Sequence, residues 1–400
     1  MRPRWSLLGP AFVAAIAYVD PGNIAANVSA GSQFGFLLVW VIVAANVMAA
    51  LVQYLSAKLG LVTGRTLPEA VRDRTGTASR IGYWVQAELV AIATDVAEII
   101  GGAIALHLLF GLPLVLGGVI TGVVSLLLLT IGDRRGQRVF ERVITGLLMV
   151  ITVGFLASLV VNTPPPGDVI GGLVPRFDGV QSVLLATAML GATVMPHAVY
   201  LHSGLARDRH GHPEPGPQRA VLLRATRWDV GLAMLVAGTV NLALLLVAAT
   251  NLRGREGTDT IEGAHAAVAD TLGPGVALFF AIGLLASGLA STSVGAYAGA
   301  MIMQGLLRRT FPLLVRRLVT LVPALLVLAS GVDPTRALVL SQVVLSFGIP
   351  FALIPLIRLT SDRALMGADV NTRLTTTLGW SVAALITALN VALIYLTLTG

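Results

Sequence analysis

Two short segments of the sequence place chemically useful groups beside a proline inside an apolar run. The first reads Ala-Tyr-Val-Asp-Pro over residues 17–21, and the second reads Ala-Thr-Val-Met-Pro over residues 192–196. Each proline lacks an N–H and clashes with the carbonyl one turn back, so we expect a helix through either segment to break there. The carbonyls of Ala17 and Ala192 then lose their helical partners.

The groups at these two breaks predict a site for a divalent transition metal. A carboxylate and an amide supply hard oxygens, whereas a thioether disfavours Mg²⁺ and Ca²⁺, which prefer all-oxygen shells. Mn²⁺ and Fe²⁺ are the weakest binders in the affinity series, so one thioether does not decide which ion is physiological. The expected ligands are the side chains of Asp20, Asn23 and Met195 and the carbonyls of Ala17 and Ala192.

The composition predicts that lipid surrounds these segments. Of the 400 residues, 56% are hydrophobic and only 12% are charged, which is too apolar for a soluble chain. Long apolar runs, such as 230–250 and 378–396, approach the roughly 20 residues of a helical span and exclude a barrel of alternating strands. The absence of cysteine excludes disulfides and thiolate metal sites.

The apolar runs predict an all-α membrane protein with eleven helical spans in a single transporter domain, residues 1–400. Five spans separate the two breaks, so the broken helices enter from opposite sides, as in an inverted repeat that works by alternating access. We expect spans at 6–34 and 180–206, both interrupted, and at 35–60, 80–110, 113–132, 140–162, 229–251, 275–306, 313–331, 335–359 and 375–398.

Basic residues predict the orientation of these spans. In a soluble protein a net charge of +7 would suggest nucleic acid, but in a membrane protein basic residues collect in cytoplasmic loops. We expect a cytoplasmic N-terminus, an outer C-terminus and a bacterial inner membrane, with residues 207–227 as a flexible inner linker. Of the 27 basic residues, only four then lie outside: Arg176, Arg253, Arg255 and Arg336.

The third span predicts a proton route. Its carboxylates Glu88, Asp95 and Glu98 fall within about 80° on one helix face, where exposure to lipid would be prohibitive. Their network with basic partners could pass protons or form static ion pairs that fix helix packing. The candidate partners are His197, Arg316 and Arg317, and two further polar groups, Asn241 and Gln342, are either packing contacts or site residues.

Several motifs together resemble the Nramp family of proton-coupled divalent metal transporters. Asp20-Pro21-Gly22-Asn23 and Met195-Pro196-His197 look like its paired signatures, supported by Thr94-Asp95-Val96-Ala97-Glu98, Arg316-Arg317 and Ser341-Gln342. The resemblance implies a LeuT-like fold of two inverted five-helix repeats, about 6–162 and about 180–359, plus an extra eleventh helix, about 375–398. It also implies import of Mn²⁺ or Fe²⁺ with H⁺, and passage of Cd²⁺ and Co²⁺.

The same resemblance assigns roles to residues. The metal would be bound by Asp20, Asn23, Met195, Ala17 and Ala192, with Gln342 joining in some conformations. The proton route would comprise Asp95, Glu98, His197, Arg316 and Arg317, to which we add Glu88 and Asn241 as candidates.

Other function classes fit the sequence less well. An amino-acid or other cation symporter of the same architecture would grip a substrate carboxylate with half-helix N-termini, and Asp20 argues against an anion there. An intramembrane hydrolase would need a motif such as His-Glu-x-x-His, which is absent, so we expect no enzyme. We expect no cofactor, with the divalent metal and H⁺ as substrates. The lipid bilayer is an expected partner and nucleic acid is not, and the sequence does not identify a protein partner.

Overall fold

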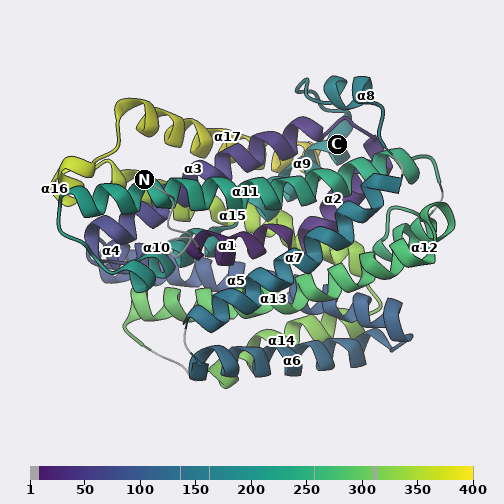
Figure 1. Cartoon of the computed structure of the whole chain (residues 1–400), viewed down its shortest axis with the longest axis horizontal. Helices are drawn as coiled ribbons and strands as arrows, with labels where there is room; N and C mark the ends of the chain where they lie inside the picture. Colours follow the sequence, from purple (N-terminus) through teal and green to yellow (C-terminus); the bar gives the residue numbers. More distant parts are fainter. Residues whose placement is uncertain (1–8, 136, 162, 256, 310–312, 400) are drawn as a thin grey trace.

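The computed structural model describes residues 9–135, 137–161, 163–255, 257–309 and 313–399, without the side chains of 128–135, 137–141, 144, 154, 157–161, 313, 314, 316 and 317. Every element in these ranges is helical (Figure 1). The helices are α1 (Pro10–Ala15), η2 (Ile16–Val19), α2 (Pro21–Phe34), α3 (Val39–Thr63), α4 (Leu67–Arg72), α5 (Thr77–Phe110), α6 (Leu114–Arg135), α7 (Gln137–Val161), α8 (Pro166–Gly171), α9 (Gly179–Thr193), α10 (Pro196–His210), α11 (Pro217–Asn251), α12 (Ile261–Leu272), α13 (Pro274–Leu307), α14 (Leu313–Ala329), α15 (Pro334–Thr360), α16 (Arg363–Met366), η3 (Gly367–Asp369) and α17 (Arg373–Thr399).

Seven helical stretches among the described residues are long and apolar enough to cross a membrane, judged by length and composition. They are α3, α5, α9 with α10, α11, α13, α15 and α17. Shorter apolar stretches lie at Pro10–Val19, Leu114–Leu127 and Leu318–Ala329. These elements match predicted spans in position, and the total of eleven crossings stays a prediction.

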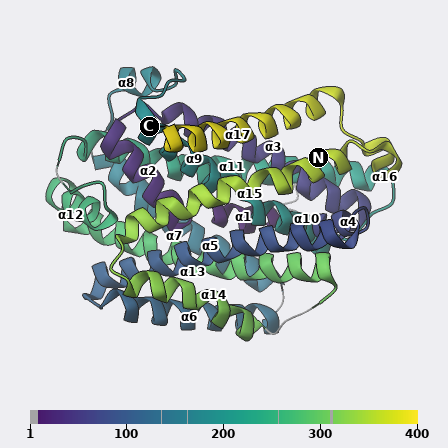
Figure 2. The same cartoon turned by 180° about the vertical axis from the view of Figure 1, so that it is seen from behind.

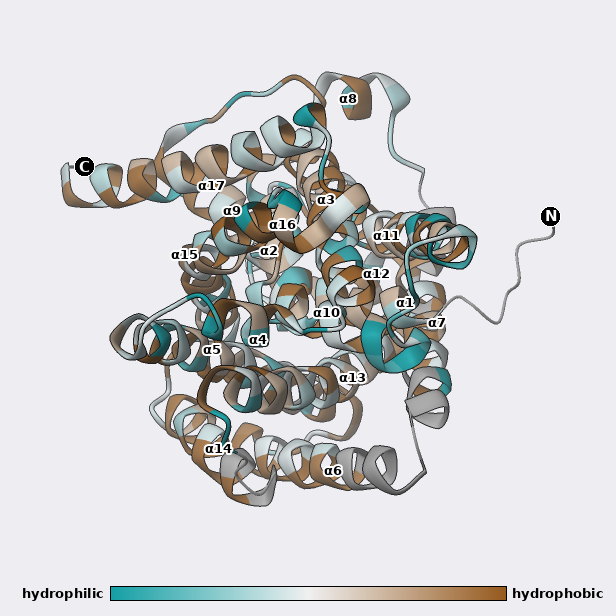
Figure 3. Cartoon of the chain, turned by 90° about the vertical axis from the view of Figure 1, so that its left-hand side faces the viewer, coloured by the Kyte–Doolittle hydropathy of each residue, from teal (hydrophilic) through white to brown (hydrophobic). Residues whose placement is uncertain are grey.

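The outer surface of the helix bundle is apolar, as lipid contact requires. The long helices run along one axis, with α6 and α14 at one edge of the bundle and α17 near the opposite edge (Figures 1 and 2). Viewed along that axis, hydrophobic residues colour these outer helices as well as the interior (Figure 3). Large apolar side chains are exposed there, among them Leu127 of α6 at 59% and Leu398 of α17 at 80%.

The two broken helices run in opposite directions along the long axis. In Figure 1, α1 to α2 runs from left to right and α9 to α10 runs from right to left, and both directions are reversed in the view from behind (Figure 2). This arrangement agrees with the antiparallel pair expected of an inverted repeat.

The predicted flexible linker over 207–227 is wrong. Helix α10 continues to His210 and α11 begins at Pro217, so only residues 211–216 are non-helical. Proline is favourable at the first helical position because its missing N–H has no helical partner there. Pro217, which lies inside the predicted linker, therefore starts a helix of 35 residues.

The start of the first broken helix is attached to α11. Gly9 N and Ala11 N each donate a 3.0 Å hydrogen bond to a different carboxylate oxygen of Asp229. Asp229 is buried and lies on the long α11. It thereby satisfies amide groups that a helix N-terminus cannot pair internally.

Candidate functional site

The first break has the form that its proline predicts. Helix α1 tightens into the 3₁₀ segment η2, which ends at Val19, and Pro21 is the first residue of α2. Between them Asp20 is extended, with φ −69° and ψ 167°, and caps α2 by accepting a 2.7 Å hydrogen bond from Asn23 N. Asp20 is thus held at the centre of the interruption by the helix that follows it.

The second break repeats this pattern in the opposite direction. Helix α9 ends at Thr193, Val194 and Met195 leave the helical conformation, and Pro196 begins α10. Met195 precedes the first turn of α10 and is fully buried. Both predicted helix breaks are therefore present in the structure.

One hydrogen bond joins the two breaks. Asn23 Nδ2 donates to the carbonyl of Ala192 at 2.7 Å, and this carbonyl is the one that Pro196 frees. Gln342 approaches from α15, with its Nε2 at 3.4 Å from Asp20 Oδ2 and 3.1 Å from Ser341 Oγ. The structure thus brings four predicted metal-site residues together from three separate spans.

The oxygens of this cluster are suited to a cation. All six predicted metal-site residues are buried, with Ala17 in η2 and Met195 on the second break. Two buried acceptors, Asn23 Oδ1 and Gln342 Oε1, accept no hydrogen bond from the described residues. A buried acceptor without a donor is costly, and a bound cation would satisfy it.

The donor set differs from that of a resident metal centre. Among the described residues, no group of three or more His, Cys, Asp or Glu side chains could hold a metal ion. The cluster at the breaks instead combines a single carboxylate with amide oxygens, carbonyls and a thioether. Such a set can bind a transition ion and release it again, because few formal charges hold it.

Side chains from other helices satisfy the backbone that the first break frees. Asn241 Nδ2 of α11 donates to Tyr18 O at 2.7 Å, while its Oδ1 accepts from Asn27 Nδ2 at 3.0 Å. Ser287 Oγ of α13 donates to Val19 O at 2.5 Å. The structure therefore places Asn241 at the first break. Asn27 and Ser287 were missed, and their only sequence signal is a polar side chain within an apolar run.

A second chain of polar contacts begins at Tyr18. Gln53 Nε2 of α3 contacts the Tyr18 hydroxyl, and Gln53 Oε1 lies 2.7 Å from Nδ1 of His202 on α10. All three side chains are buried. This chain links the two broken helices through α3, and none of its members was predicted from the sequence.

The predicted proton-route residues on α5 lie close to the second break. Asp95 and Glu98 are buried, whereas Glu88 is half-buried. His197 is also buried and reaches α5, with its Nδ1 at 3.4 Å from Thr94 Oγ1. The side chains of Arg316 and Arg317 lie outside the described residues, so their predicted contacts with these carboxylates stay a prediction.

Glu98 also faces α13 across a close helix contact. A Cβ placed on Gly295 of α13 would lie 3.2 Å from Glu98 Oε1, and one on Gly288 would lie 3.1 Å from the Glu98 carbonyl. The two glycines therefore let α13 approach the carboxylate-bearing face of α5. This packing excludes lipid from that face, as the sequence analysis requires.

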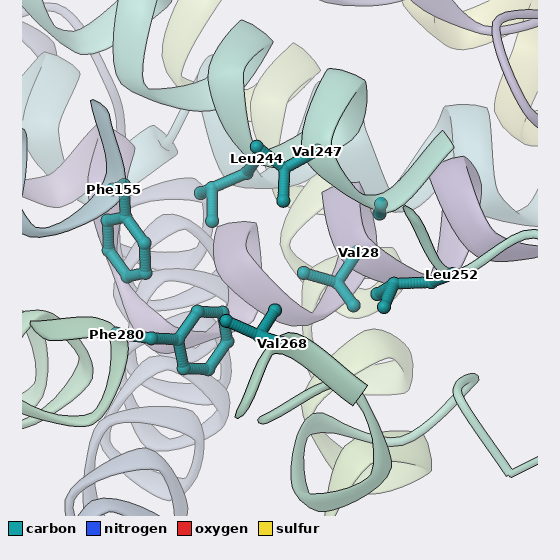
Figure 4. A pocket seen from close by; sticks show the side chains of 8 residues that line it. Val28, Phe155, Leu244, Val247, Leu252, Val268 and Phe280 are labelled. Carbon is teal, nitrogen blue, oxygen red and sulfur yellow. The ribbon is translucent and has the colours of Figure 1, made fainter. Parts of the chain in front are cut away.

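A separate small cavity has no ligand for a cation. Val28, Phe155, Leu244 and Phe280 are among its lining residues, which are all apolar (Figure 4). The cavity lies among α2, α7, α11, α12 and α13 and includes none of the predicted metal-site residues.

This fold and this site together define a class of protein, namely a polytopic helical transporter with a polar site at two antiparallel helix breaks. Comparison with known families makes the class specific. The family described as Nramp, natural resistance-associated macrophage protein-like, matches residues 11–396. The chain belongs to the Nramp family.

Relatives cover almost the whole chain. A protein named divalent metal cation transporter MntH from Mycobacterium tuberculosis is 72% identical over 400 residues, spanning 100% of this chain and 94% of the relative. A Bacillus subtilis protein of the same name is 48% identical over 97% of this chain and 91% of the relative.

Solved structures share the fold. A crystal structure of the Eremococcus coleocola manganese transporter, in complex with an aromatic bis-isothiourea substituted compound, matches with a TM-score of 0.86 and 33% identity. The match covers 96% of this chain and 85% of that one. Mhp1, described as a nucleobase-cation-symport-1 family transporter, matches with a TM-score of 0.63 and 18% identity over 98% and 92%, which shows the fold alone.

Proposed function

We propose that this protein imports divalent transition-metal ions, namely Mn²⁺ and also Fe²⁺, Cd²⁺ and Co²⁺, together with protons. The observation that carries the proposal is the Asn23–Ala192 hydrogen bond, which joins two helix breaks around Asp20 and two acceptor oxygens that lack donors. The names of the relatives, a divalent metal cation transporter and a manganese transporter, support it.

The metal would bind between the two breaks. Asp20 supplies the negative charge that offsets part of the ion's charge, and Asn23 and Gln342 supply neutral oxygens. Met195 supplies a soft ligand that favours transition ions over Ca²⁺ and Mg²⁺. The carbonyls of Ala17 and Ala192 complete the proposed shell.

Protons would cross by a neighbouring route along α5. Asp95 and Glu98 are buried one turn apart on this helix, and His197, which follows Met195-Pro196, has its Nδ1 3.4 Å from Oγ1 of Thr94, the residue before Asp95. An imidazole and two carboxylates can exchange protons over short distances. Glu88, Arg316 and Arg317 would continue this route, and Asn241 would couple the first break to it.

Alternating access would use the two half-helix pairs. Each break is a point where one half of a helix can tilt relative to the other without tearing a continuous hydrogen-bond ladder. Because the broken helices are antiparallel, α1 and α10 lie toward one end of the long axis and α2 and α9 toward the other. Each of these two pairs would face one side of the membrane. We place the protein in a bacterial inner membrane, with the N-terminus cytoplasmic and the C-terminus outside.

The test is Mn²⁺ uptake into proteoliposomes with internal pH recorded in parallel. We expect the parent protein to take up Mn²⁺ with internal acidification and Asp20→Ala to abolish both. Asp95→Asn should reduce the acidification that accompanies each ion more than it reduces Mn²⁺ uptake. Asp168→Ala, which removes an exposed carboxylate on α8, is the matched control and should behave like the parent.

Each component of the proposal has its own contrary result. A parent that moves no divalent metal but couples an amino acid to ion flux would favour the symporter of the same architecture. Mn²⁺ uptake without any acidification would retain metal transport and reject the proton route. Uptake that survives in Asp20→Ala would place the metal elsewhere.

A further inference from the structure

Helix α15, which carries Gln342, contains two internal prolines. Pro350 and Pro355 lie within Pro334–Thr360. A proline cannot donate to the carbonyl four residues earlier, so the carbonyls of Ser346 and Phe351 lose their helical donors. In lipid a freed carbonyl needs another partner or access to water.

The carbonyl of Ser346 receives its partner from the last helix. Asn390 Nδ2 of α17 donates to Ser346 O at 3.0 Å, and Ser346 Oγ donates to Asn390 Oδ1 at 2.7 Å. Ser346 is fully buried, and Asn390 is buried against it. The amide of Asn390 therefore holds this one residue of α15 at two points.

The carbonyl of Phe351 receives its partner from a different element. Tyr200 on α10 donates through its hydroxyl to Phe351 O at 3.3 Å and is buried. Thus the two proline-freed carbonyls of α15 are bound by separate helices: the first by α17 and the second by the half-helix α10 that follows the second break.

The Ser346 contact lies one helical turn from Gln342, the α15 residue that approaches Asp20. A Cβ on Gly191 of α9 would lie 2.0 Å from Gln342 O and 2.8 Å from Ser346 N, so this turn also packs against the helix that bears Ala192. Helix α17 lies beside α15 (Figures 1 and 2). The position of this turn is therefore fixed from two sides, by Gly191 and by Asn390.

We propose that Asn390 is a positioning residue for the metal site. By replacing the hydrogen bond that Pro350 removes, it holds the α15 turn that presents Gln342 to Asp20. Helix α17, which is the predicted eleventh span and stands outside the two predicted repeats, thereby acts on substrate affinity through α15. This inference rests on the proposed function and deepens it, because it assigns a role in that same site to a residue that does not touch the metal.

The decisive experiment is a double-mutant cycle on Mn²⁺ uptake in proteoliposomes. Asn390→Ala should raise the apparent KM for Mn²⁺ about threefold to tenfold, the range expected when the two buried hydrogen bonds between these membrane helices are lost. The maximal rate per folded protein should change less. In a Gln342→Ala background the same substitution should have little further effect on KM, because its action passes through Gln342.

Matched variants separate positioning from general packing. Thr387→Val removes a hydroxyl one turn away on α17 that bonds only to Ala383 O of its own helix, so it should leave KM unchanged. Ser346→Ala removes only the hydroxyl half of the Asn390 contact and keeps the carbonyl. It should raise KM by less than Asn390→Ala, and it provides the measurement if the latter does not fold.

The outcomes distinguish this inference from the proposed function. If the parent transports Mn²⁺ and Asn390→Ala raises KM by the same factor with and without Gln342, Asn390 does not act through that side chain and the inference is wrong. An unchanged KM in both Asn390→Ala and Ser346→Ala overturns it as well. A parent that transports no Mn²⁺ removes the proposed function and this inference with it.

Discussion

Replacing Gly22 by alanine should disturb one ligand of the metal site while sparing the backbone around it. A Cβ at this position would lie 1.8 Å from Gln342 Nε2 and 2.3 Å from its Cδ, and the three nearest atoms all belong to that flexible side chain. The side chain of Gln342 must therefore move away from Asp20. Gly22→Ala should consequently reproduce the transport behaviour of Gln342→Ala.

The size of the effect follows from the contacts that are lost. Displacing Gln342 breaks its 3.4 Å contact with Asp20 and its 3.1 Å hydrogen bond with Ser341, and it withdraws one candidate oxygen ligand. Hydrogen bonds to a charged group contribute about 1.5–3 kcal/mol at best. Because the contact here is long, we expect the free energy of Mn²⁺ binding to weaken by about 1–2 kcal/mol. This corresponds to a rise of about fivefold to thirtyfold in the apparent KM for Mn²⁺.

The assay is Mn²⁺ uptake with Gly22→Ala, Gln342→Ala and the double variant. Alanine at position 342 makes room for the new Cβ, so the double variant should match Gln342→Ala alone. Gly231→Ala, on an open face of α11, is the matched control and should not affect uptake. Additive effects of the two site substitutions would refute the steric reasoning, because each would then act on a different feature of the protein.

Two further predictions concern the metal ligand and the support of the first break. Met195→Ala should retain Mn²⁺ uptake better than Cd²⁺ uptake and relax the exclusion of Ca²⁺ and Mg²⁺, measured by competition in proteoliposomes; unchanged selectivity would reject the thioether as the selective ligand. Asn241→Leu should lower the free energy of unfolding by about 1–3 kcal/mol, seen as a lower thermal midpoint in detergent, because it removes hydrogen bonds to Tyr18 and Asn27. The control Thr239→Val loses only a bond within its own helix, and an equal loss in both variants would contradict this role of Asn241.

The sequence was sufficient to predict the helix breaks and the cluster around them. Proline at positions 21 and 196 has a local steric effect that does not depend on the rest of the fold, so both interruptions follow from the chain itself. Asp20, Asn23 and Met195 lie within three residues of those prolines, and their proximity to the site follows directly. For Gln342 the residue pattern alone left packing and site roles open, because its approach depends on how α15 packs, and only the family resemblance placed it among the metal ligands.

The partners of the freed carbonyls were not predictable from the sequence. Asn390, Tyr200 and Ser287 each meet a carbonyl on another helix, and such meetings depend on the crossing angles and rotations of whole helices. Pro350 and Pro355 indicated only that two carbonyls of α15 need partners. Which side chains supply them is decided by tertiary packing.

The short helices between spans were also missed. Helices α4 and α12 occupy segments that we read as loops, although Thr66 with Glu69 forms a capping box at the start of α4. That four-residue pattern is a local signal, and it could have been used. Neither α4, with six residues, nor α12, with twelve, is long enough to form the apolar run of about 20 residues that predicts a span.

The attachment of the first broken helix to α11 has a consequence for how the chain is made. The amides of Gly9 and Ala11 pair with Asp229, which is 220 and 218 residues further along the chain, and Tyr18 O pairs with Asn241, 223 residues further along. During synthesis the first span therefore enters the membrane long before these partners emerge from the ribosome. Until α11 is inserted, the broken backbone of the first span must find its hydrogen-bond partners in the translocation channel, in water or in lipid headgroups. The first segment to be inserted is thus one of the last to receive all its hydrogen-bond partners. In a nascent chain that stops before α11, these unpaired backbone groups would stay exposed to the quality-control machinery of the cell.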